Sequence, residues 1–165
     1  MKIRDATEVD LQAIVDIYNA AIPTRMSTAD TEPVSVEFRR SWFNAHMPQS
    51  RPVWVAEEDG LVLGWLSLES FHGRPVYANT AEVSVYVSLN HRRQDIGRTL
   101  LNEAVRSGPV LGLAVLLAFV FGHNTPSLKL FEGAGFAQWG YLPGVANMDG
   151  IDRDLVILGR RVDQV

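Results

Sequence analysis

The sequence predicts an α/β sandwich with a mixed sheet, and three observations support this. Segments with strand and helix periodicity follow one another in the order β-α-α-β-β-β-α-β-α-β-β, which is typical of a layered α/β domain. Residues 113–121 are apolar without alternation, as expected of a strand buried on both faces. Residues 82–108 change from strand period to helix period across a polar, basic turn.

The composition indicates one globular domain covering residues 1–165, because 47% of the residues are hydrophobic and 21% are charged. The net charge of −4 argues against general nucleic-acid binding, which needs a basic surface. The chain has no cysteine, which excludes disulfides, cysteine-based zinc sites and cysteine nucleophiles. The four histidines lack the spacing of metal ligands, so we expect no metal site.

The sequence shows no pattern typical of membrane insertion or export. Its longest apolar run, residues 110–121, is too short to span a bilayer and contains Gly112. The first residues lack the basic and then apolar pattern of a signal peptide. We therefore expect a cytoplasmic protein with no membrane partner.

The first part of the chain predicts a strand, a helix and a long loop. Residues 2–6 are expected to form a short strand, and Thr7 is suited to cap the helix because Asp10 can reach back to it. An apolar stripe at helical spacing follows: Leu11, Ile14, Val15, Tyr18 and Ala21. Pro23 ends this helix. The polar segment 24–34 is long for a compact domain, which favours a functional loop.

A second helix and a hairpin are expected next. Ser35 is placed to cap a helix whose aromatic residues favour core packing over the lining of a ligand cleft: Phe38, Trp42 and Phe43. The segments 53–57 and 61–68 flank Asp59-Gly60, a dipeptide that suits the tight turn between antiparallel strands. Residues 71–81 lead into the central strand.

The last part of the chain predicts a helix and two strands. Thr125 as N-cap and Pro126 at the first helical position predict the start of the helix, and Gly135 is expected to end it. The two closing strands and the loop between them are expected at residues 136–142, 151–162 and 143–150.

The turn between the central strand and the next helix is the strongest candidate site. Alternation runs over residues 83–89, and the helical period begins at Arg98 and ends at Gly108. Backbone N–H groups and the positive end of the helix then point at one spot, which suits a phosphate or pyrophosphate. From the residues alone, an alternative is that this turn only connects the strand to the helix. Its arginines would then face solvent: Arg92, Arg93 and Arg98.

This turn resembles the acyl-CoA signature of the GNAT superfamily of N-acetyltransferases, a strand followed by Arg/Gln-x-x-Gly-x-Gly/Ala and a helix. Here it reads Arg92-Arg93-Gln94-Asp95-Ile96-Gly97, with Asp95 in place of the first glycine. The order of elements matches the superfamily over nearly the whole chain. Two further stretches are similar to its phosphinothricin and methionine sulfone/sulfoximine acetyltransferase group: Arg74-x-x-Tyr77-x-x-Thr80-x-Glu82 and Asn124-x-x-Ser127-x-x-Leu130-x-Glu132-x-x-Gly135-Phe136.

The resemblance implies a three-layer sandwich with a mostly antiparallel sheet, and transfer of the acetyl group of acetyl-CoA to a small amino-acid-like amine. It implies Glu82 as a general base acting through water and the backbone N–H of Val85 as the oxyanion donor. Arg74 and Tyr77 are expected to bind the acceptor. The expected cofactor-binding residues are Val85, Tyr86, Val87, Arg92, Arg93, Gln94, Asp95, Ile96, Gly97, Arg98, Asn124 and Ser127. Without the resemblance, Glu82 is a surface glutamate at a strand end.

Several alternatives stay open at the level of the sequence. One alternative acceptor is an antibiotic, a polyamine or a protein N-terminus. Residues 24–46 and 71–81 would decide between these acceptors and an amino acid. Phe131 stands where the superfamily has a tyrosine, or often a histidine in the phosphinothricin group, that protonates the CoA thiolate. Water is then the candidate donor, with Tyr141 and His123 nearby in sequence. A non-catalytic acyl-CoA sensor and an interaction protein without a CoA site are the other classes, and a homodimer is implied by resemblance alone.

Overall fold

A computed structural model of the protein describes residues 1–163. It contains one seven-stranded sheet with the strand order β1-β2-β3-β4-β5-β7-β6. The strands are β1 (Lys2–Asp5), β2 (Val53–Glu58), β3 (Leu61–Ser70), β4 (Thr80–Val87), β5 (Val115–Phe121), β6 (Ala137–Met148) and β7 (Ile151–Arg161). The helices are α1 (Leu11–Ala21), α2 (Val36–Asn44), α3 (Ile96–Ser107) and α4 (Thr125–Gly133). The expected order of elements and the three-layer α/β fold are confirmed.

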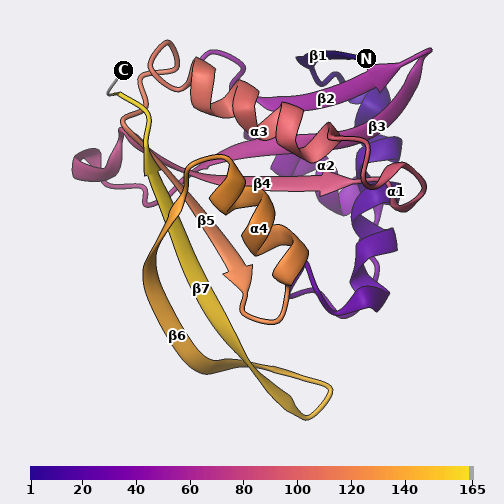
Figure 1. Ribbon diagram of the computed structural model, residues 1–165. Helices are drawn as coiled ribbons and strands as arrows, with labels where there is room; N and C mark the ends of the chain where they lie inside the picture. The colour runs from indigo at the N-terminus through magenta and orange to yellow at the C-terminus, as the bar shows by residue number, and fades with distance from the viewer. Residues whose placement is uncertain (164–165) are drawn as a thin grey trace.

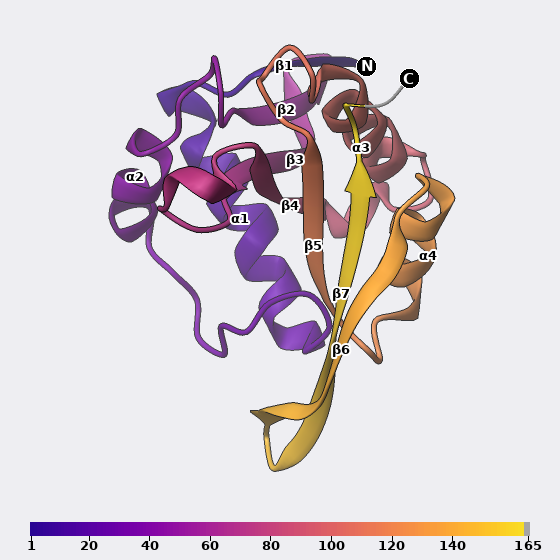
Figure 2. The same cartoon turned by 90° about the vertical axis from the view of Figure 1, so that its left-hand side faces the viewer.

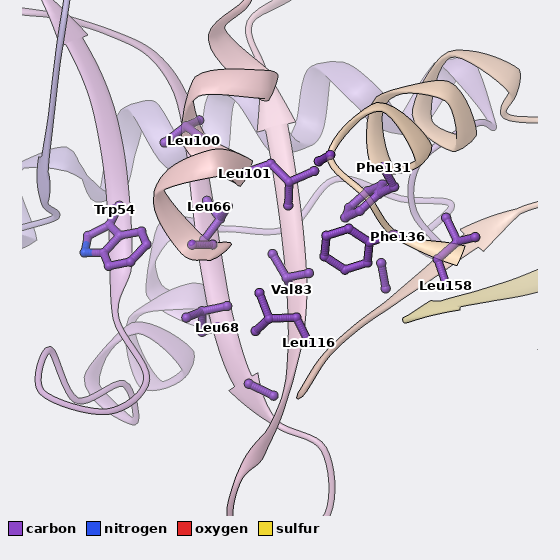
Figure 3. Close-up of a cluster of buried hydrophobic side chains, with 14 of the residues drawn as sticks. Trp54, Leu66, Leu68, Val83, Leu100, Leu101, Leu116, Phe131, Phe136 and Leu158 are labelled. Carbon is purple, nitrogen blue, oxygen red and sulfur yellow. The ribbon is translucent and has the colours of Figure 1, made fainter. Parts of the chain in front are cut away.

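The helices cover the two faces of the sheet in pairs. Figure 2 shows α1 and α2 on one side of the strands and α3 and α4 on the other. The larger apolar cluster lies beneath α3 and α4, where Leu100, Leu101 and Leu116 are fully buried and Phe131 packs on Phe136 (Figure 3). A smaller cluster beneath α1 and α2 is built on Trp65. Both helix layers are therefore held by apolar burial against the same sheet.

Local sequence signals explain where several elements begin and turn. The Thr7 backbone N–H donates to Asp10 Oδ2 at 2.8 Å, and the Ser35 hydroxyl accepts from the Phe38 N–H at 3.0 Å, as expected of the two helix caps. Asp59 and Gly60 both have positive φ, which the tight turn between β2 and β3 requires.

The sheet opens at its centre, between β4 and β5. All other neighbouring strands are antiparallel, whereas β4 and β5 run parallel and pair only from Thr80 with Val115 to Glu82 with Leu117. Beyond this short ladder the two strands diverge, as Figure 1 shows. One edge of β4 is therefore left without a partner strand over its second half.

Several expected boundaries were wrong, among them those of the central strand, of α3 and of the closing loop. The central strand ends at Val87 and α3 begins at Ile96, so the helix starts two residues before Arg98. The loop expected at 143–150 is instead part of a long β6–β7 hairpin, which turns at Asp149 and Gly150. The pairing register shifts near Gln138 and between Leu142 and Ala146, and the second shift accommodates Pro143 and Gly144 within β6. These irregularities hide the strand alternation in the sequence.

Among the helices of the described chain, none is both long and apolar enough to cross a lipid bilayer.

Candidate active site

A cavity of about 370 Å³ lies where β4 ends and α3 begins. It brings together four separate parts of the chain: the end of α1 with the loop after it, β4, the turn into α3, and the start of α4. Its lining residues are Ala21, Met26, Ser27, Val85, Tyr86, Val87, His91, Arg92, Arg93, Asp95, Ile96, Gly97, Arg98, Asn124, Pro126, Ser127 and Leu130. All the residues expected to bind the cofactor line this cavity except Gln94.

The turn from residue 92 to residue 98 presents unused backbone donors to the cavity. Within residues 1–163, no N–H group from Arg93 to Arg98 donates a hydrogen bond, and the first helical bond of this end runs from Thr99 N–H to the Asp95 carbonyl. Gly97 is buried, and a Cβ there would approach Leu130 Cδ2 to 3.2 Å. A small residue therefore leaves room at a helix N-terminus that is electrostatically suited to an anion.

Asp95 explains why the superfamily pattern has a glycine at this position. Its φ of 58° lies in the left-handed region, which aspartate tolerates better than most residues. Its carboxylate turns to Arg98, with 2.8 Å between Arg98 Nη2 and Asp95 Oδ2. The negative charge at the turn is thus paired with a neighbouring arginine.

Two backbone N–H groups of β4 point into the gap beside β5. In an antiparallel ladder, alternate residues bond to the partner strand. Ser88 N–H donates to the Leu63 carbonyl of β3 at 2.8 Å. By alternation, the N–H groups of Tyr86 and Ser84 also point toward β3. The N–H groups of Val85 and Val87 consequently point away from β3. A second cavity of about 50 Å³ lies there, between residues 83–86 and residues 118–121.

Tyr86 lines the cavities but is held on the other face of the sheet. Its ring stacks on Trp65 at 4.8 Å, and its hydroxyl donates to the Ser27 carbonyl at 3.1 Å. Burial raises the pKa of Tyr86 well above its usual value, so the phenol stays neutral. The side chain therefore fixes the loop after α1 to the sheet.

Asn124, and not Thr125, is the N-cap of α4, which corrects the expected boundary by one residue. Its side-chain oxygen accepts from the Ser127 N–H at 3.2 Å, while its Nδ2 donates to the Met26 carbonyl at 2.9 Å. The asparagine is 6% exposed and lines both cavities. It ties the start of α4 to the loop that closes the cavity.

Glu82 lies at the point where β4 and β5 separate, on the α1 and α2 face of the sheet. It is directly opposite Glu69 of β3. Burial, and then the negative charge of Glu69, raise the pKa of Glu82. Glu69 itself accepts a hydrogen bond from Trp42 Nε1 at 2.6 Å, whereas no bond to Glu82 is made by any side chain of residues 1–163. The raised pKa brings this carboxylate closer to the range of a useful base.

The two residues expected to bind the acceptor lie in the segment between β3 and β4. Tyr77 belongs to a cluster of aromatic rings, with 5.6 Å between the centroids of Tyr77 and Phe71 and 6.4 Å between those of Phe71 and Phe119. Arg74 is exposed and, within the part of the chain that the structure describes, makes no side-chain hydrogen bond or ion pair. Neither residue lines the two cavities.

The side chains near the expected proton donor are engaged elsewhere. Phe131 is buried in the core, 3% exposed, with its ring at the floor of the smaller cavity. Tyr141 lies on β6 and donates to Asp154, and this bond raises the pKa of the phenol. His123 Nε2 is 2.7 Å from the Arg25 carbonyl. Neither Tyr141 nor His123 lines either cavity.

The structure adds site residues that sequence reasoning missed. Met26 and Ser27 come from the loop that its length marked as functional, but nothing in the sequence placed that loop beside α4. His91 and Leu130 also line the larger cavity. His91 precedes the basic turn, and Leu130 is the second residue after Leu128 on α4, so neither carries a recognisable chemical signal. Among residues 1–163, no group of three or more potential metal ligands comes together.

The comparison with known proteins agrees with this geometry. Residues 12–136 match the model of the Acetyltransferase (GNAT) family. YwnH of Bacillus subtilis, which is named for phosphinothricin acetylation, is 55% identical over 98% of this chain and 99% of its own. The L-methionine sulfoximine/L-methionine sulfone acetyltransferase of Salmonella typhimurium is 30% identical over 99% and 96%. A phosphinothricin acetyltransferase from Sinorhizobium meliloti, solved in complex with AcCoA, superimposes with a TM-score of 0.92 at 27% identity over 98% and 88%.

Proposed function

The chain belongs to the GNAT family of acetyltransferases, and from this premise we propose that it transfers the acetyl group of acetyl-CoA directly to the amine of a small amino-acid-like molecule. Acceptors of the phosphinothricin and methionine sulfone or sulfoximine type are proposed because relatives across the whole length of the chain are named for them. The observation that carries the proposal is the juxtaposition of an anion-binding turn, an open strand edge and a carboxylate of raised pKa at the split in the sheet.

The turn before α3 is proposed to hold the pyrophosphate of acetyl-CoA. Its free N–H groups from Arg93 to Arg98 supply donors, and Arg92 and Arg93 supply positive charge at the same cavity. Asn124 and Ser127 flank the opposite wall. These features suit a diphosphate, since the donors are already in place and no acceptor within the described residues uses them.

The unpaired edge of β4 is proposed to receive the pantetheine arm and the reacting carbonyl. Val85 and Val87 offer backbone groups to an extended chain, as in the addition of a strand to a sheet edge. The N–H of Val85 is the donor proposed to bind the carbonyl oxygen as it gains negative charge. Because a backbone donor is fixed by the sheet, it needs no reorganisation during the reaction.

Glu82 is proposed to accept, through water, the proton that the acceptor ammonium must lose before its nitrogen attacks. The nitrogen lone pair then forms the C–N bond at the thioester carbonyl carbon, the C–S bond breaks, and the nitrogen releases its second proton to water. The thiolate takes up a proton from that water, because Phe131 has none to give and lines the smaller cavity. The pKa of Glu82, raised by burial and by Glu69, favours the proton-accepting step near neutral pH.

The test is release of the CoA thiol from acetyl-CoA with a panel of free amino acids, phosphinothricin, methionine sulfone and methionine sulfoximine. We expect turnover on the amino-acid analogues and a loss of about 100-fold in kcat for Glu82→Gln, within the range typical of general bases. Acetyl-CoA at about 100 times Kd should add about 2.7 kcal/mol to the free energy of unfolding of both proteins.

The outcomes separate the remaining function classes. A thermal shift without turnover on any amine, with Glu82→Gln unchanged, would replace the enzyme by an acyl-CoA sensor. Turnover confined to polyamines, an antibiotic or a peptide N-terminus would keep the reaction and change the acceptor. If acetyl-CoA causes no thermal shift and no amine is acetylated, the protein has no CoA site.

We also propose that the protein forms a homodimer through the β6–β7 hairpin. The hairpin extends beyond the body of the molecule (Figures 1 and 2). It exposes five large apolar side chains, each between 41% and 57% accessible: Trp139, Tyr141, Leu142, Val145 and Ile151. The bulges and Pro143 interrupt the free edge of β6, so packing of these side chains would hold the two copies rather than strand pairing.

A further inference from the structure

The face of the sheet beneath α1 and α2 carries a polar group of residues that the steps above do not use. Ser67 and Ser84 are directly opposite each other on β3 and β4, between the pair Glu69–Glu82 and the pair Trp65–Tyr86. Alternate residues of a strand share one face, so all three pairs point toward the same helices. Ser67 is 1% exposed, yet its hydroxyl has no hydrogen-bond partner within residues 1–163.

Arg39 of α2 stacks on two aromatic rings of the same layer. Its guanidinium carbon is 4.1 Å from the ring centroid of Tyr18 and 4.5 Å from that of Trp42. Trp42 in turn packs on Trp65 at 5.6 Å and donates to Glu69 at 2.6 Å. Trp42 therefore links the planar guanidinium to Trp65 and Glu69, the residues of β3 on either side of Ser67 on this face.

The guanidinium of Arg39 is not used by the fold. None of its nitrogens donates a hydrogen bond or joins an ion pair with residues 1–163, and Nε is buried without a partner. A buried donor of this kind is unfavourable unless something occupies it. Arginine offers a rigid fork that matches a carboxylate, and stacking on aromatic rings keeps that fork in place.

The other two arginines of this region are less suited to the same task. Arg51 donates to the Ser50 and Ala78 carbonyls at 2.8 and 2.7 Å, so its outer nitrogens are occupied by the backbone. Arg74, which sequence reasoning assigned to the acceptor, is exposed on the 3₁₀ segment Pro75–Tyr77 as its N-cap. An exposed, solvated arginine loses more conformational freedom on binding than one already fixed by packing, and so contributes less to affinity.

We propose that Arg39 and the Ser67 hydroxyl, two groups of this layer with a buried polar atom that has no partner within residues 1–163, bind the carboxylate of the amino-acid acceptor, while the acceptor's α-amine faces Glu82. The inference rests on the proposed function and names the residue that would select amino acids over simple amines. Placing the carboxylate at α2 orients the α-amine toward the split between β4 and β5, where the acetyl group arrives.

The experiment compares wild type, Arg39→Gln, Arg39→Lys, Arg40→Gln and Arg74→Gln. Two quantities are measured: the KM for L-methionine sulfone, and the inhibition constant of 4-(methylsulfonyl)butanoate, which keeps the carboxylate and lacks the amine. Loss of a charge-assisted pair predicts that Arg39→Gln raises both by about 10- to 100-fold. Arg39→Lys should recover part of this loss, because it restores the charge without the fork. The KM for acetyl-CoA should stay within about twofold in every variant.

Arg40→Gln is the matched control, with the same chemical change at the next residue of α2, where the guanidinium is already paired with Glu8 and Glu37; it is expected to leave both constants within about twofold. Arg74→Gln tests the arginine that the sequence assigned to the acceptor. A melting temperature near that of wild type, with the acetyl-CoA shift retained, shows that the Arg39 variants fold. If wild type turns over L-methionine sulfone and Arg39→Gln changes neither constant, or Arg74→Gln causes the loss, the inference is wrong and the proposed function stands. If wild type acetylates no amino acid, the proposed function fails, and the inference with it.

Discussion

Glu82, the residue proposed as the base, lies in surroundings that disfavour its charged form and thereby act against stability. Its side chain is partly buried and faces the like charge of Glu69 across the β3–β4 ladder. Like charges directly opposite each other destabilise a sheet, and burial without a hydrogen bond adds to that effect. Both causes raise the pKa of Glu82, which is the property that a base near neutral pH requires.

Glu82→Gln is therefore expected to stabilise the protein at pH 7 while it lowers activity. The pKa of Glu82 is higher in the folded than in the unfolded state, so the folded state binds more protons between the two values and stability falls as pH rises through that window. The variant should melt higher than wild type at pH 7, and the difference should vanish below about pH 4, near the unfolded pKa of glutamate. Thermal unfolding across pH measures this, with exposed Glu132→Gln as the control. An equal shift at both pH values would contradict it.

Asp95 is a second residue whose charge and backbone conformation can be tested together. Glycine accepts the positive φ without strain, and its introduction removes a negative charge from the rim of the cavity and frees Arg98. An exposed pair is worth about 0.2–1 kcal/mol, so Asp95→Gly should lower the KM for acetyl-CoA by about 1.4- to 5-fold, most clearly at low salt. Asp95→Asn, which removes the charge and tolerates the same φ, separates the two causes. A rise in KM would show that the carboxylate itself helps to bind CoA.

At the scale of elements, the start of α4 couples helix formation to the shape of the cavity. Asn124 caps the helix with its oxygen and holds the Met26 carbonyl with its nitrogen. Asn124→Ala removes both bonds at a buried position, so we expect a loss of about 1–3 kcal/mol in the free energy of unfolding and weaker binding of acetyl-CoA. Urea unfolding at constant m-value measures the first and a thermal shift the second. Thr125→Ala, one residue away and exposed, should cost less than about 0.5 kcal/mol; equal losses would mean that capping does not depend on Asn124.

Turn chemistry explains which elements could be predicted from the sequence. Asp59-Gly60 was recognised because alternating strands flank it on both sides. Asp149-Gly150 is the same dipeptide in the same conformation, with φ values of 52° and 83°. It was missed because β6 has bulges and Pro143, so its residues do not alternate. Local patterns therefore predicted the order of the elements, whereas irregular strands hid one hairpin.

At the scale of the whole molecule, the anion-binding half of the site was predictable and the acceptor half was not. The turn from 92 to 98 is contiguous, so its arginines and glycine carry their signal in the sequence itself. Arg39, Glu69 and Glu82 come from three elements and are linked, through Trp42, only after α2 packs on β3 and β4. No spacing in the sequence encodes that link, and Arg39 stands in a segment whose aromatic residues favoured core packing over a ligand cleft.

The proposed homodimer through the β6–β7 hairpin can be tested by a substitution on the hairpin. In a two-fold symmetric dimer each substitution at the interface acts twice. Val145→Lys replaces an apolar side chain that is 57% exposed in the single chain, and the loss of about 1.5 kcal/mol per copy should weaken association at least about 100-fold. Light scattering after gel filtration should then give the 18.3 kDa of one chain for the variant and twice that mass for wild type.

Val110→Lys is the control, because Val110 is 88% exposed in the turn after α3, far in the fold from the hairpin tip (Figure 1). It should leave the mass unchanged. Val145 lines neither cavity, so the monomeric Val145→Lys variant should retain the acetyl-CoA thermal shift of wild type. A wild type that elutes as a single chain at high concentration would exclude the dimer, and loss of the shift in the monomer would place a residue of the partner in the cofactor site.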